Sequence, residues 1–397
     1  MKLTTGQTYW DKTAAPAAHF PLLNENHTTE ILIIGGGMSG TLAACKLAES
    51  GKRVTVIDRA EVGRGSSSAN TGLLQYASDT MLSEFVDRIG EEDAVLFYKM
   101  CLESMNQLTE IASKLPETTG YRLRDSIYYA STQNDADKLK REYGFLNKYN
   151  FPAEYLNHTQ LLEQYEIDKP AALRTWHDAE VNPYQFIQAL TEENLKMGVT
   201  YFEHTSIDMD SLNDTSVLTE TGAQITFDSL IIATGYSNLY SELNGKAQIN
   251  QTFAIATKPI KGELWKDNVM VWETKKPYLY FRTAPGGRMI AGGLDEESSD
   301  LHDDPELIQQ KGQEILDEIK EMFPKLDVEI DDAWNSLFGI SKDGLPFMGA
   351  SSQHDNVYYL LGFEGNGTCY SMAGAAIIQD LLDEKPNPYA HIVRPSR

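Results

Sequence analysis

Cysteine is scarce in this chain, and its scarcity limits the kinds of site that the protein can build. Only three cysteines occur among 397 residues, Cys45, Cys101 and Cys369, and no two of them form a Cys-x-x-Cys pair. Neither a disulfide framework nor a thiolate metal cluster is therefore expected, and we predict a cytoplasmic protein. The eight histidines show neither His-x-x-x-His nor His-Glu-x-x-His spacing, so no metal site is expected.

The chain also has few basic residues and no long apolar runs. Lys and Arg number 34 against 58 Asp and Glu, and the formal net charge of −24 would repel nucleic acid and anionic membrane surfaces. The apolar runs are broken by glycine or charge well before the roughly 20 residues that a membrane span requires. The polar residues 1–29 contain no secretory signal. These features predict a soluble protein that binds neither nucleic acid nor membrane.

A compact β-α-β unit begins at residue 31. Residues 31–34 form an aliphatic run that is typical of a buried parallel strand, residues 41–49 show helical spacing, and residues 54–57 form a second strand. Between the first strand and the helix lies the sequence Gly35-x-Gly37-x-x-Gly40. In a dinucleotide site these glycines permit a tight turn, the approach of the pyrophosphate and close helix packing.

Asp58 ends the second strand, where it would accept hydrogen bonds from ribose hydroxyls. Glycine clusters are often simple turns, and an aspartate at the end of a strand is often a solvated cap. Strand, glycines, helix and acid together indicate a dinucleotide site with its phosphates at the helix N-terminus. The pattern alone does not distinguish NAD from FAD.

The remainder of the chain predicts two interleaved domains. Residues 252–294 alternate and are rich in aromatics, which favours an antiparallel sheet. Further helices are expected at 80–115, 135–148, 183–196, 304–323 and 371–382, and further strands at 126–130, 199–202, 216–220, 229–233 and 357–361. We predict an α/β, Rossmann-like dinucleotide-binding domain interleaved with an α+β domain that has an antiparallel sheet.

Three further segments follow the β-α-β unit, and the four together carry a resemblance to a known family. They are residues 63–74 (GRGSSSANTGLL), residues 230–237 (LIIATGYS) and residues 334–368, which include SKDGLPFMG and GFEGNGT. In this order they resemble the D-amino-acid oxidase superfamily of FAD-dependent amine and amino-acid oxidoreductases, which contains glycine oxidase, sarcosine oxidase and gamma-glutamylputrescine oxidase. The resemblance implies an FAD-binding domain from residues 1–80, 181–251 and 335–397, and a substrate domain from residues 81–180 and 252–334.

The resemblance also implies which residues contact FAD. The residues so implied are Gly35, Gly37, Met38, Ser39, Gly40, Asp58, Arg59, Ser66, Ser67, Asn70, Thr71, Gly72, Leu73, Ile207, Ala233, Thr234, Gly235, Gly339, Gly362, Gly365, Asn366, Gly367 and Thr368. The helix after the last glycine-rich turn would stabilise the negative charge of the reduced flavin.

Three positions depart from the pattern of the relatives. Ser336 aligns with the cysteine that binds flavin covalently in sarcosine oxidase-like members, so we expect non-covalent FAD. Cys369 aligns with a carboxylate-binding lysine, and Phe338 with a carboxylate-binding arginine. The segment around Tyr9-Trp10 looks like the extension of gamma-glutamylputrescine oxidase-type members. Together these features favour an amine or N-substituted substrate slightly over a free amino acid.

Few residues are candidates for substrate contact. Arg282 would bind a carboxylate or form a surface ion pair, and Tyr280 and Tyr278 would pack against a substrate cation or belong to the sheet core. His177 and Glu180 would line the site, but a polar linker at residues 176–183 is slightly favoured.

The resemblance implies a reaction in which hydride passes from the carbon beside a small amine or amino-acid nitrogen to flavin N5. The imine hydrolyses, and oxygen or another acceptor takes the electrons. One alternative is a dehydrogenase or reductase with another donor or acceptor, although the sequence at residues 291–293 is too short for a second dinucleotide motif. The other alternative is a non-catalytic FAD-binding subunit.

Overall fold

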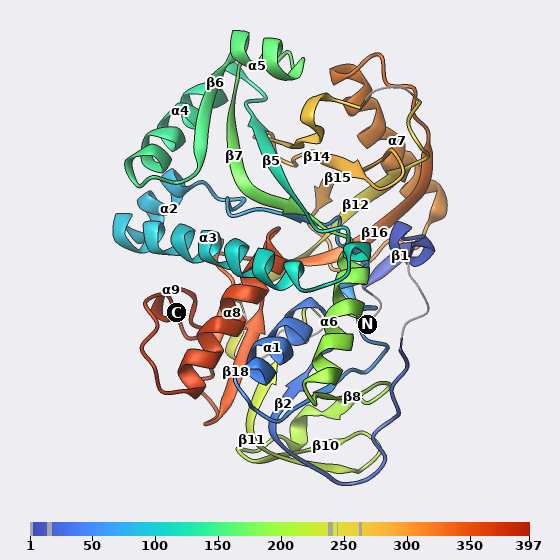
Figure 1. The fold of residues 1–397 in the computed structure, drawn as a ribbon, viewed down its shortest axis with the longest axis vertical. Helices are drawn as coiled ribbons and strands as arrows, with labels where there is room; N and C mark the ends of the chain where they lie inside the picture. Colours follow the sequence, from blue (N-terminus) through green and yellow to red (C-terminus); the bar gives the residue numbers. More distant parts are fainter. Residues whose placement is uncertain (1–2, 14–17, 237–240, 244, 262–263) are drawn as a thin grey trace.

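Two β-sheets organise the protein in this computed structural model, which describes residues 3–13, 18–236, 241–243, 245–261 and 264–397. The smaller sheet forms the lower half of Figure 1 and the larger sheet the upper half. The smaller sheet has the order β17-β18-β11-β2-β3-β8. Its strands are β17 (Phe347–Ala350), β18 (Val357–Leu361), β11 (Gln224–Ile232), β2 (His27–Ile34), β3 (Val54–Ile57) and β8 (Thr200–Phe202), and β10 (Ser216–Thr219) and β9 (Ile207–Asp208) extend it from β11.

The centre of this sheet is parallel and buried on both faces. Leu32 of β2 pairs with Leu230 of β11 on one side and with Thr55 of β3 on the other. Ile31 and Ile33 face a core shared with helices, whereas Leu32 faces the core on the opposite side. The β-branched composition that predicted these strands therefore matches their two-sided burial.

Three helices cover the first of these faces, and they come from distant parts of the sequence (Figure 1). They are α1 (Met38–Glu49), α6 (Pro183–Lys196) and α8 (Gly367–Leu382). The side chain of Asn182 accepts a hydrogen bond from the Gln185 amide, and Pro183 occupies the first turn, so α6 begins where the sequence predicts.

The larger sheet has the order β1-β16-β12-β15-β14-β13-β5-β7-β4, with β6 paired to β7. Neighbouring strands are antiparallel except β13 and β5, so the sheet is mainly antiparallel, as the sequence predicts. Its strands are β1 (Thr4–Gly6), β16 (Ile330–Ser341), β12 (Ala247–Thr257), β15 (Arg288–Glu296), β14 (Tyr280–Ala284), β13 (Met270–Glu273), β5 (Arg122–Tyr129), β7 (Ala171–Glu180), β4 (Leu73–Leu74) and β6 (Ala153–Asn157).

Most of the remaining helices lie beside this sheet, but the last of them, α9 (Ala390–Val393), packs against β17 of the smaller sheet. The others are α2 (Leu82–Ile89), α3 (Glu91–Ser113), α4 (Gln133–Lys148), α5 (His158–Tyr165) and α7 (Pro305–Met322). Short 3-10 helices occur at Tyr9–Lys12, Ser66–Ala69, Glu117–Thr119, Met209–Ser211, Ser241–Leu243 and Lys266–Asn268. Within the described ranges, no helix has both the length and the apolar character that crossing a bilayer requires.

One prediction about the larger sheet was wrong. Residues 176–180, expected in a polar linker, belong to β7, which pairs with β5. A register shift interrupts this pairing, and His177 has a positive φ of 70°, so the alternation of side chains breaks where the sequence reads as a linker. Two long strands also run past the boundaries expected at 251/252 and 334/335, since β12 begins at Ala247 and β16 ends at Ser341.

Candidate functional site

The glycine-rich loop between β2 and α1 owes its shape to two close backbone contacts. Gly35 has a φ of 112°, and a Cβ there would lie 2.3 Å from the carbonyl oxygen of Ala233. A Cβ on Gly40 would lie 1.8 Å from the carbonyl oxygen of Gly35. A Cβ on Gly37 would meet only Ser67 Oγ, at 3.0 Å. Gly35 and Gly40 thus allow the chain to pack, while Gly37 leaves the loop open to a ligand.

Asp58 lies beside this loop at the end of β3. Its Oδ2 atom accepts a hydrogen bond from the Gly36 amide at 2.7 Å, and its Oδ1 atom accepts one from the Ala60 amide at 2.8 Å. Burial raises the pKa of Asp58, and these two hydrogen bonds oppose the shift. The neighbouring Arg59 is exposed. The acid therefore stands at the position expected of a ribose-binding carboxylate.

The Ser-rich segment runs directly past the start of α1. Ser67 Oγ accepts a hydrogen bond from the Met38 amide at 3.0 Å. Ser66 Oγ is buried without a partner. Asn70 Oδ1 accepts a hydrogen bond from the Gly72 amide at 2.6 Å, which closes a tight turn before Leu73 enters β4.

Two buried tryptophans hold the backbone of the Ser-rich segment by hydrogen bonds. Trp10 Nε1 donates to the carbonyl oxygen of Asn70 at 2.7 Å, and Trp334 Nε1 donates to the carbonyl oxygen of Ala69 at 3.0 Å. Both indole side chains are fully enclosed. Residues far apart in the sequence, near its start and on β16, thereby hold two consecutive carbonyl groups.

Arg282 supports the next residue of the same segment. Its guanidinium donates to the carbonyl oxygens of Thr71 at 2.8 Å, Val181 at 2.7 Å and Thr283 at 2.9 Å. It is 1% exposed, and Glu180 Oε2 lies 3.8 Å from Nη1. Burial lowers the pKa of Arg282 to about 10, and Glu180 opposes the shift. This placement differs from the expected contact with substrate, because Arg282 is absent from the residues that line the cavity described below.

The last glycine-rich turn leads into α8. A Cβ on Gly362 would lie 2.8 Å from the carbonyl oxygen of Gly367. The Gly365 amide donates to Asp79 Oδ2 at 2.8 Å, and Asn366 Nδ2 donates to the carbonyl oxygen of Ala77 at 2.5 Å. These contacts attach the turn to the chain that follows β4.

Helices α1 and α8 meet near their N-termini. Ser39 Oγ and Ser371 Oγ lie 2.7 Å apart, so Ser39 has a protein partner in addition to its expected role beside FAD. Neither helix has a side-chain cap at its N-terminus. Thr368 Oγ1, in the first turn of α8, is buried without a hydrogen-bond partner. Both helix ends therefore retain unused capacity for a polar ligand.

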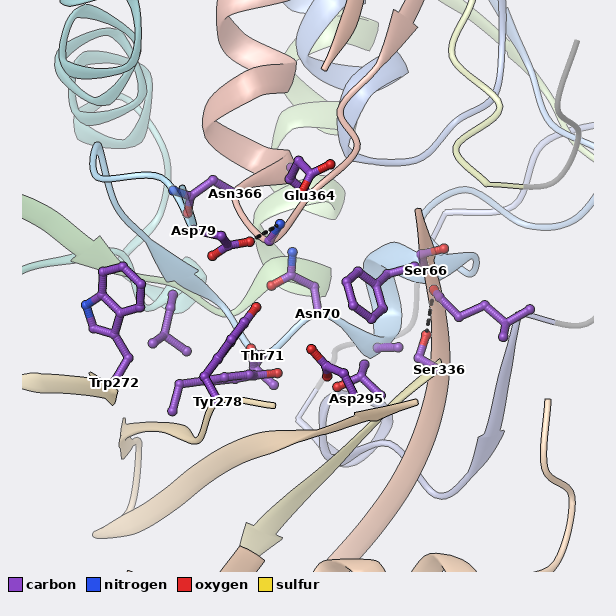
Figure 2. Close-up of a pocket in the computed structure, with 18 of the residues that line it drawn as sticks. Ser66, Asn70, Thr71, Asp79, Trp272, Tyr278, Asp295, Ser336, Glu364 and Asn366 are labelled. Atoms are coloured by element: carbon purple, nitrogen blue, oxygen red, sulfur yellow. Dashed lines mark hydrogen bonds between the residues drawn. The ribbon is translucent and has the colours of Figure 1, made fainter. Parts of the chain in front are cut away.

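A cavity of about 140 Å³ opens between the two sheets (Figure 2). One wall comes from the Ser-rich segment and the turn before α8, and the other comes from the larger sheet. The lining residues include Ser66, Ala69, Asn70, Thr71, Leu73, Gln75, Asp79, Tyr236, Thr252, Trp272, Tyr278, Tyr280, Asp295, Ser336, Leu337, Phe338, Glu364, Gly365, Asn366 and Gly367.

Three of these lining residues are carboxylic acids, Asp79, Asp295 and Glu364. Burial raises the pKa of Glu364 to about 7, against hydrogen bonds from Ser341. Burial also raises the pKa of Asp295 to about 6, and the nearby charge of Asp79 adds to the shift. The cavity therefore contains two acids that change protonation close to neutral pH.

The remaining predicted residues are spread unevenly around this cavity. Tyr280 lines it together with Tyr278, and their ring centres lie 5.7 Å apart. Gly339 packs against the rings of Tyr236 and Phe363. Ala233, Thr234 and Gly235 follow β11, and Ser237, the last residue of that segment, lies outside the described residues.

Several predicted positions are not among the residues that line the cavity, and three of them lie on strands of the two sheets. Ile207 lies on β9, at the edge of the smaller sheet. Glu180 is buried and pairs with Arg124 at 2.9 Å, whereas His177 is exposed. Sequence reasoning in turn gave no role to Asp79 or Asp295, because no motif surrounds either acid.

Comparison with known proteins identifies a family and several similar proteins. The pattern of the family described as FAD dependent oxidoreductase matches residues 30–381. A putative Rieske 2Fe-2S iron-sulfur protein of Bacillus subtilis is 23% identical over 402 residues, covering 98% of this chain and 75% of that protein. Gamma-glutamylputrescine oxidoreductase of Escherichia coli is 23% identical over 386 residues, covering 94% of this chain and 88% of that enzyme.

A solved structure gives a likeness in fold. The crystal structure of glycine oxidase from Geobacillus kaustophilus superposes with a TM-score of 0.78 at 21% identity, covering 94% of this chain and 99% of that one.

Proposed function

The chain belongs to the FAD-dependent oxidoreductase family, and from this premise we propose that it oxidises the carbon–nitrogen bond of a small amine or amino acid. One observation carries the proposal. The cavity joins the segments that resemble flavin contacts, at Asn70 and Gly365, to the aromatic wall of the larger sheet at Tyr278 and Tyr280. A substrate in this cavity would therefore lie between the cofactor and a second, separate layer of protein.

The residues of the chain fit FAD. Ser66 Oγ and Thr368 Oγ1 are buried without protein partners. The N-termini of α1 and α8 lack side-chain caps, and such helix ends bind phosphate and stabilise negative charge. We assign the pyrophosphate to Gly37 and the start of α1, and the ribose to Asp58. Ser336 replaces the cysteine of covalent relatives, which supports non-covalent binding.

Bound FAD supplies the hydride acceptor, flavin N5, for the hydrogen on the carbon beside the amine nitrogen. The protein has two tasks beside this transfer. Tyr278, Tyr280 and Phe338 exclude water from the cavity and orient the substrate. Glu364 accepts the proton that a substrate ammonium must lose, because its pKa of about 7 suits proton exchange at neutral pH. The product is an imine, which water hydrolyses.

An anaerobic absorbance titration of the FAD-loaded protein tests the proposal. The panel contains glycine, N-methylglycine, D-alanine, gamma-glutamylputrescine and simple alkylamines. We expect at least one member to bleach the flavin absorbance, and the bleached enzyme to reoxidise with oxygen or an added acceptor. A bound flavin that no panel member reduces would reject carbon–nitrogen oxidation and favour another donor or a binding role. Protein that fails to take up FAD would reject the cofactor assignment.

A further inference from the structure

The charged side chains that line the cavity, among the residues that the structure describes, are all acidic. Asp79, Asp295 and Glu364 all line it, and none of the lining residues within the described part of the chain is Lys, Arg or His. In Figure 2, Asp79 lies by the turn that leads into α8, and Asp295 lies by the larger sheet. Negative charge is therefore present on both walls of the cavity.

The hydrogen-bond partners of Asp79 and Glu364 among the described residues are neutral groups. Asp79 accepts a hydrogen bond from the Gly365 amide at 2.8 Å, and Glu364 accepts one from the Ser341 hydroxyl at 2.9 Å. Burial raises the pKa of Asp295, and the hydroxyl of Thr252 and the charge of Lys276 oppose the shift. Across the described ranges, none of the three acids forms an ion pair with a basic side chain. Apart from the effect of Lys276 on Asp295, their charge is left for a ligand to neutralise.

Two tyrosine rings, those of Tyr278 and Tyr280, lie close enough to Asp295 for its charge to act on them. Tyr278, Tyr280 and Trp272 line the same wall, and aromatic faces attract cations. The ammonium of Lys276 lies 4.4 Å from the ring centre of Tyr278, so this ring already accommodates a cation. Lys276 itself is exposed and is not part of the cavity lining. Carboxylate and rings together form a suitable surface for a substituted ammonium.

A substrate carboxylate finds no matching partner in this cavity. The guanidinium of Arg282 is occupied by three backbone carbonyl groups, and Phe338 lines the wall with a neutral ring. Placing a carboxylate among three acids adds like charge in a partly desolvated space, which opposes binding. A cation placed there gains attraction from both walls.

We propose that the substrate has a second cationic group in addition to the amine whose carbon–nitrogen bond is oxidised. The substrate has no carboxylate. Asp295 and the Tyr278–Tyr280 pair hold the second cation. This inference rests on the proposed function, since it concerns the same cavity and the same reaction.

The first test compares compounds of equal chain length on the FAD-loaded protein. Putrescine has two amines, butylamine has one, and gamma-aminobutyrate replaces the second amine by a carboxylate. We expect putrescine to half-saturate flavin reduction at a concentration at least about tenfold lower than butylamine, the ratio of one charged hydrogen bond. Gamma-aminobutyrate is expected to be the weakest. A preference for gamma-aminobutyrate or glycine overturns the inference and leaves the proposed function standing.

The second test measures binding without turnover. Hexamethonium carries two quaternary ammonium groups and has no nitrogen lone pair to support hydride loss, and hexyltrimethylammonium carries one such group. Calorimetry on the FAD-loaded protein is expected to show tighter binding of hexamethonium. In Asp295→Asn this preference is expected to fall by at least about tenfold, as expected when a charged partner becomes neutral. Glu297→Gln, an exposed position two residues further along, is expected to keep it.

These readouts separate the two proposals. If Asp295→Asn retains the full preference for hexamethonium, the assignment of the second cation is overturned. If hexamethonium is preferred but no amine reduces the flavin, the proposed function fails while the cation site stands.

Discussion

The guanidinium of Arg282 donates a hydrogen bond to the carbonyl oxygen of Thr71 over 2.8 Å, although 211 residues separate the two in the sequence. The next residue, Gly72, has a φ of 74°, and a Cβ there would lie 2.5 Å from Nη2 of the same guanidinium. Arg282 and Gly72 therefore fit against each other. Arg282 acts as a positioning residue that holds the wall of the cavity without touching its interior.

Replacing Arg282 by lysine should weaken this support. A single ammonium does not reproduce the planar geometry with which the guanidinium reaches three carbonyl groups. We expect the free energy of unfolding to fall by about 1–3 kcal/mol, the cost of leaving a buried acceptor unsatisfied. FAD retention on gel filtration should fall as well. Arg122→Lys, at an exposed position of β5, is the control and should change neither quantity.

Gly40 offers a second test of the cofactor loop. In Gly40→Ala the new Cβ would meet the carbonyl oxygen of Gly35, so α1 must move away from β2. We expect the loss of at least about 1–3 kcal/mol of stability and of FAD binding, measured by denaturation and by flavin content. Gly144→Ala, in open space on α4, should be neutral or stabilising. Full flavin content in Gly40→Ala would contradict the assigned packing role.

Trp10 provides a test of the segment before β2. Trp10→Phe keeps an aromatic ring but leaves the carbonyl oxygen of Asn70 without this partner, so about 1–3 kcal/mol of stability should be lost. Trp10→Ala also leaves a cavity and should cost about 3–5 kcal/mol. Chemical denaturation measures both values. Trp176→Phe, at a side chain that is 36% exposed, should have little effect.

Glu364 should make stability depend on pH. Its folded-state pKa of about 7 lies above the ordinary value of 4.5, so the folded protein binds more protons than the unfolded chain between these values. The contribution of the protonated acid is thus complete below about pH 4.5, declines as pH rises and is lost above about pH 7.

The neutral variant Glu364→Gln isolates this effect. Its stability relative to the wild type should rise between about pH 4.5 and 7 and stay level above that range. Denaturation of the FAD-free protein at several pH values measures the difference, with the exposed Glu297→Gln as control. A difference that does not vary with pH would show that Glu364 titrates at an ordinary value.

Local patterns were sufficient for the elements that position the cofactor. Strands β3 and β18 and helix α6 have the predicted bounds, because β-branched runs and the Asn182-Pro183 start are local signals. Helices α1 and α8 begin three or four residues earlier than predicted. In both cases glycine and small polar residues, Ser39 and Gly40 in α1 and Gly367 and Thr368 in α8, interrupt the apolar spacing of the first turn and weaken its helical signal.

The side chains that line the cavity were harder to predict from the sequence. Asp295 reaches it because β15 lies between β14 and β12 in the larger sheet, a pairing that is set by contacts between distant strands. Arg282 is diverted from the cavity by three carbonyl groups, two of which belong to segments more than 100 residues away in sequence. Residue type indicated what each side chain is able to do, but its direction depends on tertiary packing.

The position of β18 in the smaller sheet has a consequence for how the protein folds. Strand β2 is made early, yet the sheet that supports its glycine loop also requires β11 and β18, which lie about 200 and 330 residues further along the chain. Contacts of such sequence separation form slowly, because a long loop must close before they are made. During synthesis the glycine-rich loop therefore remains unsupported until β11 and β18 have been made. The aliphatic edge of β2 is exposed until then. Folding yield should depend on how well this edge is protected.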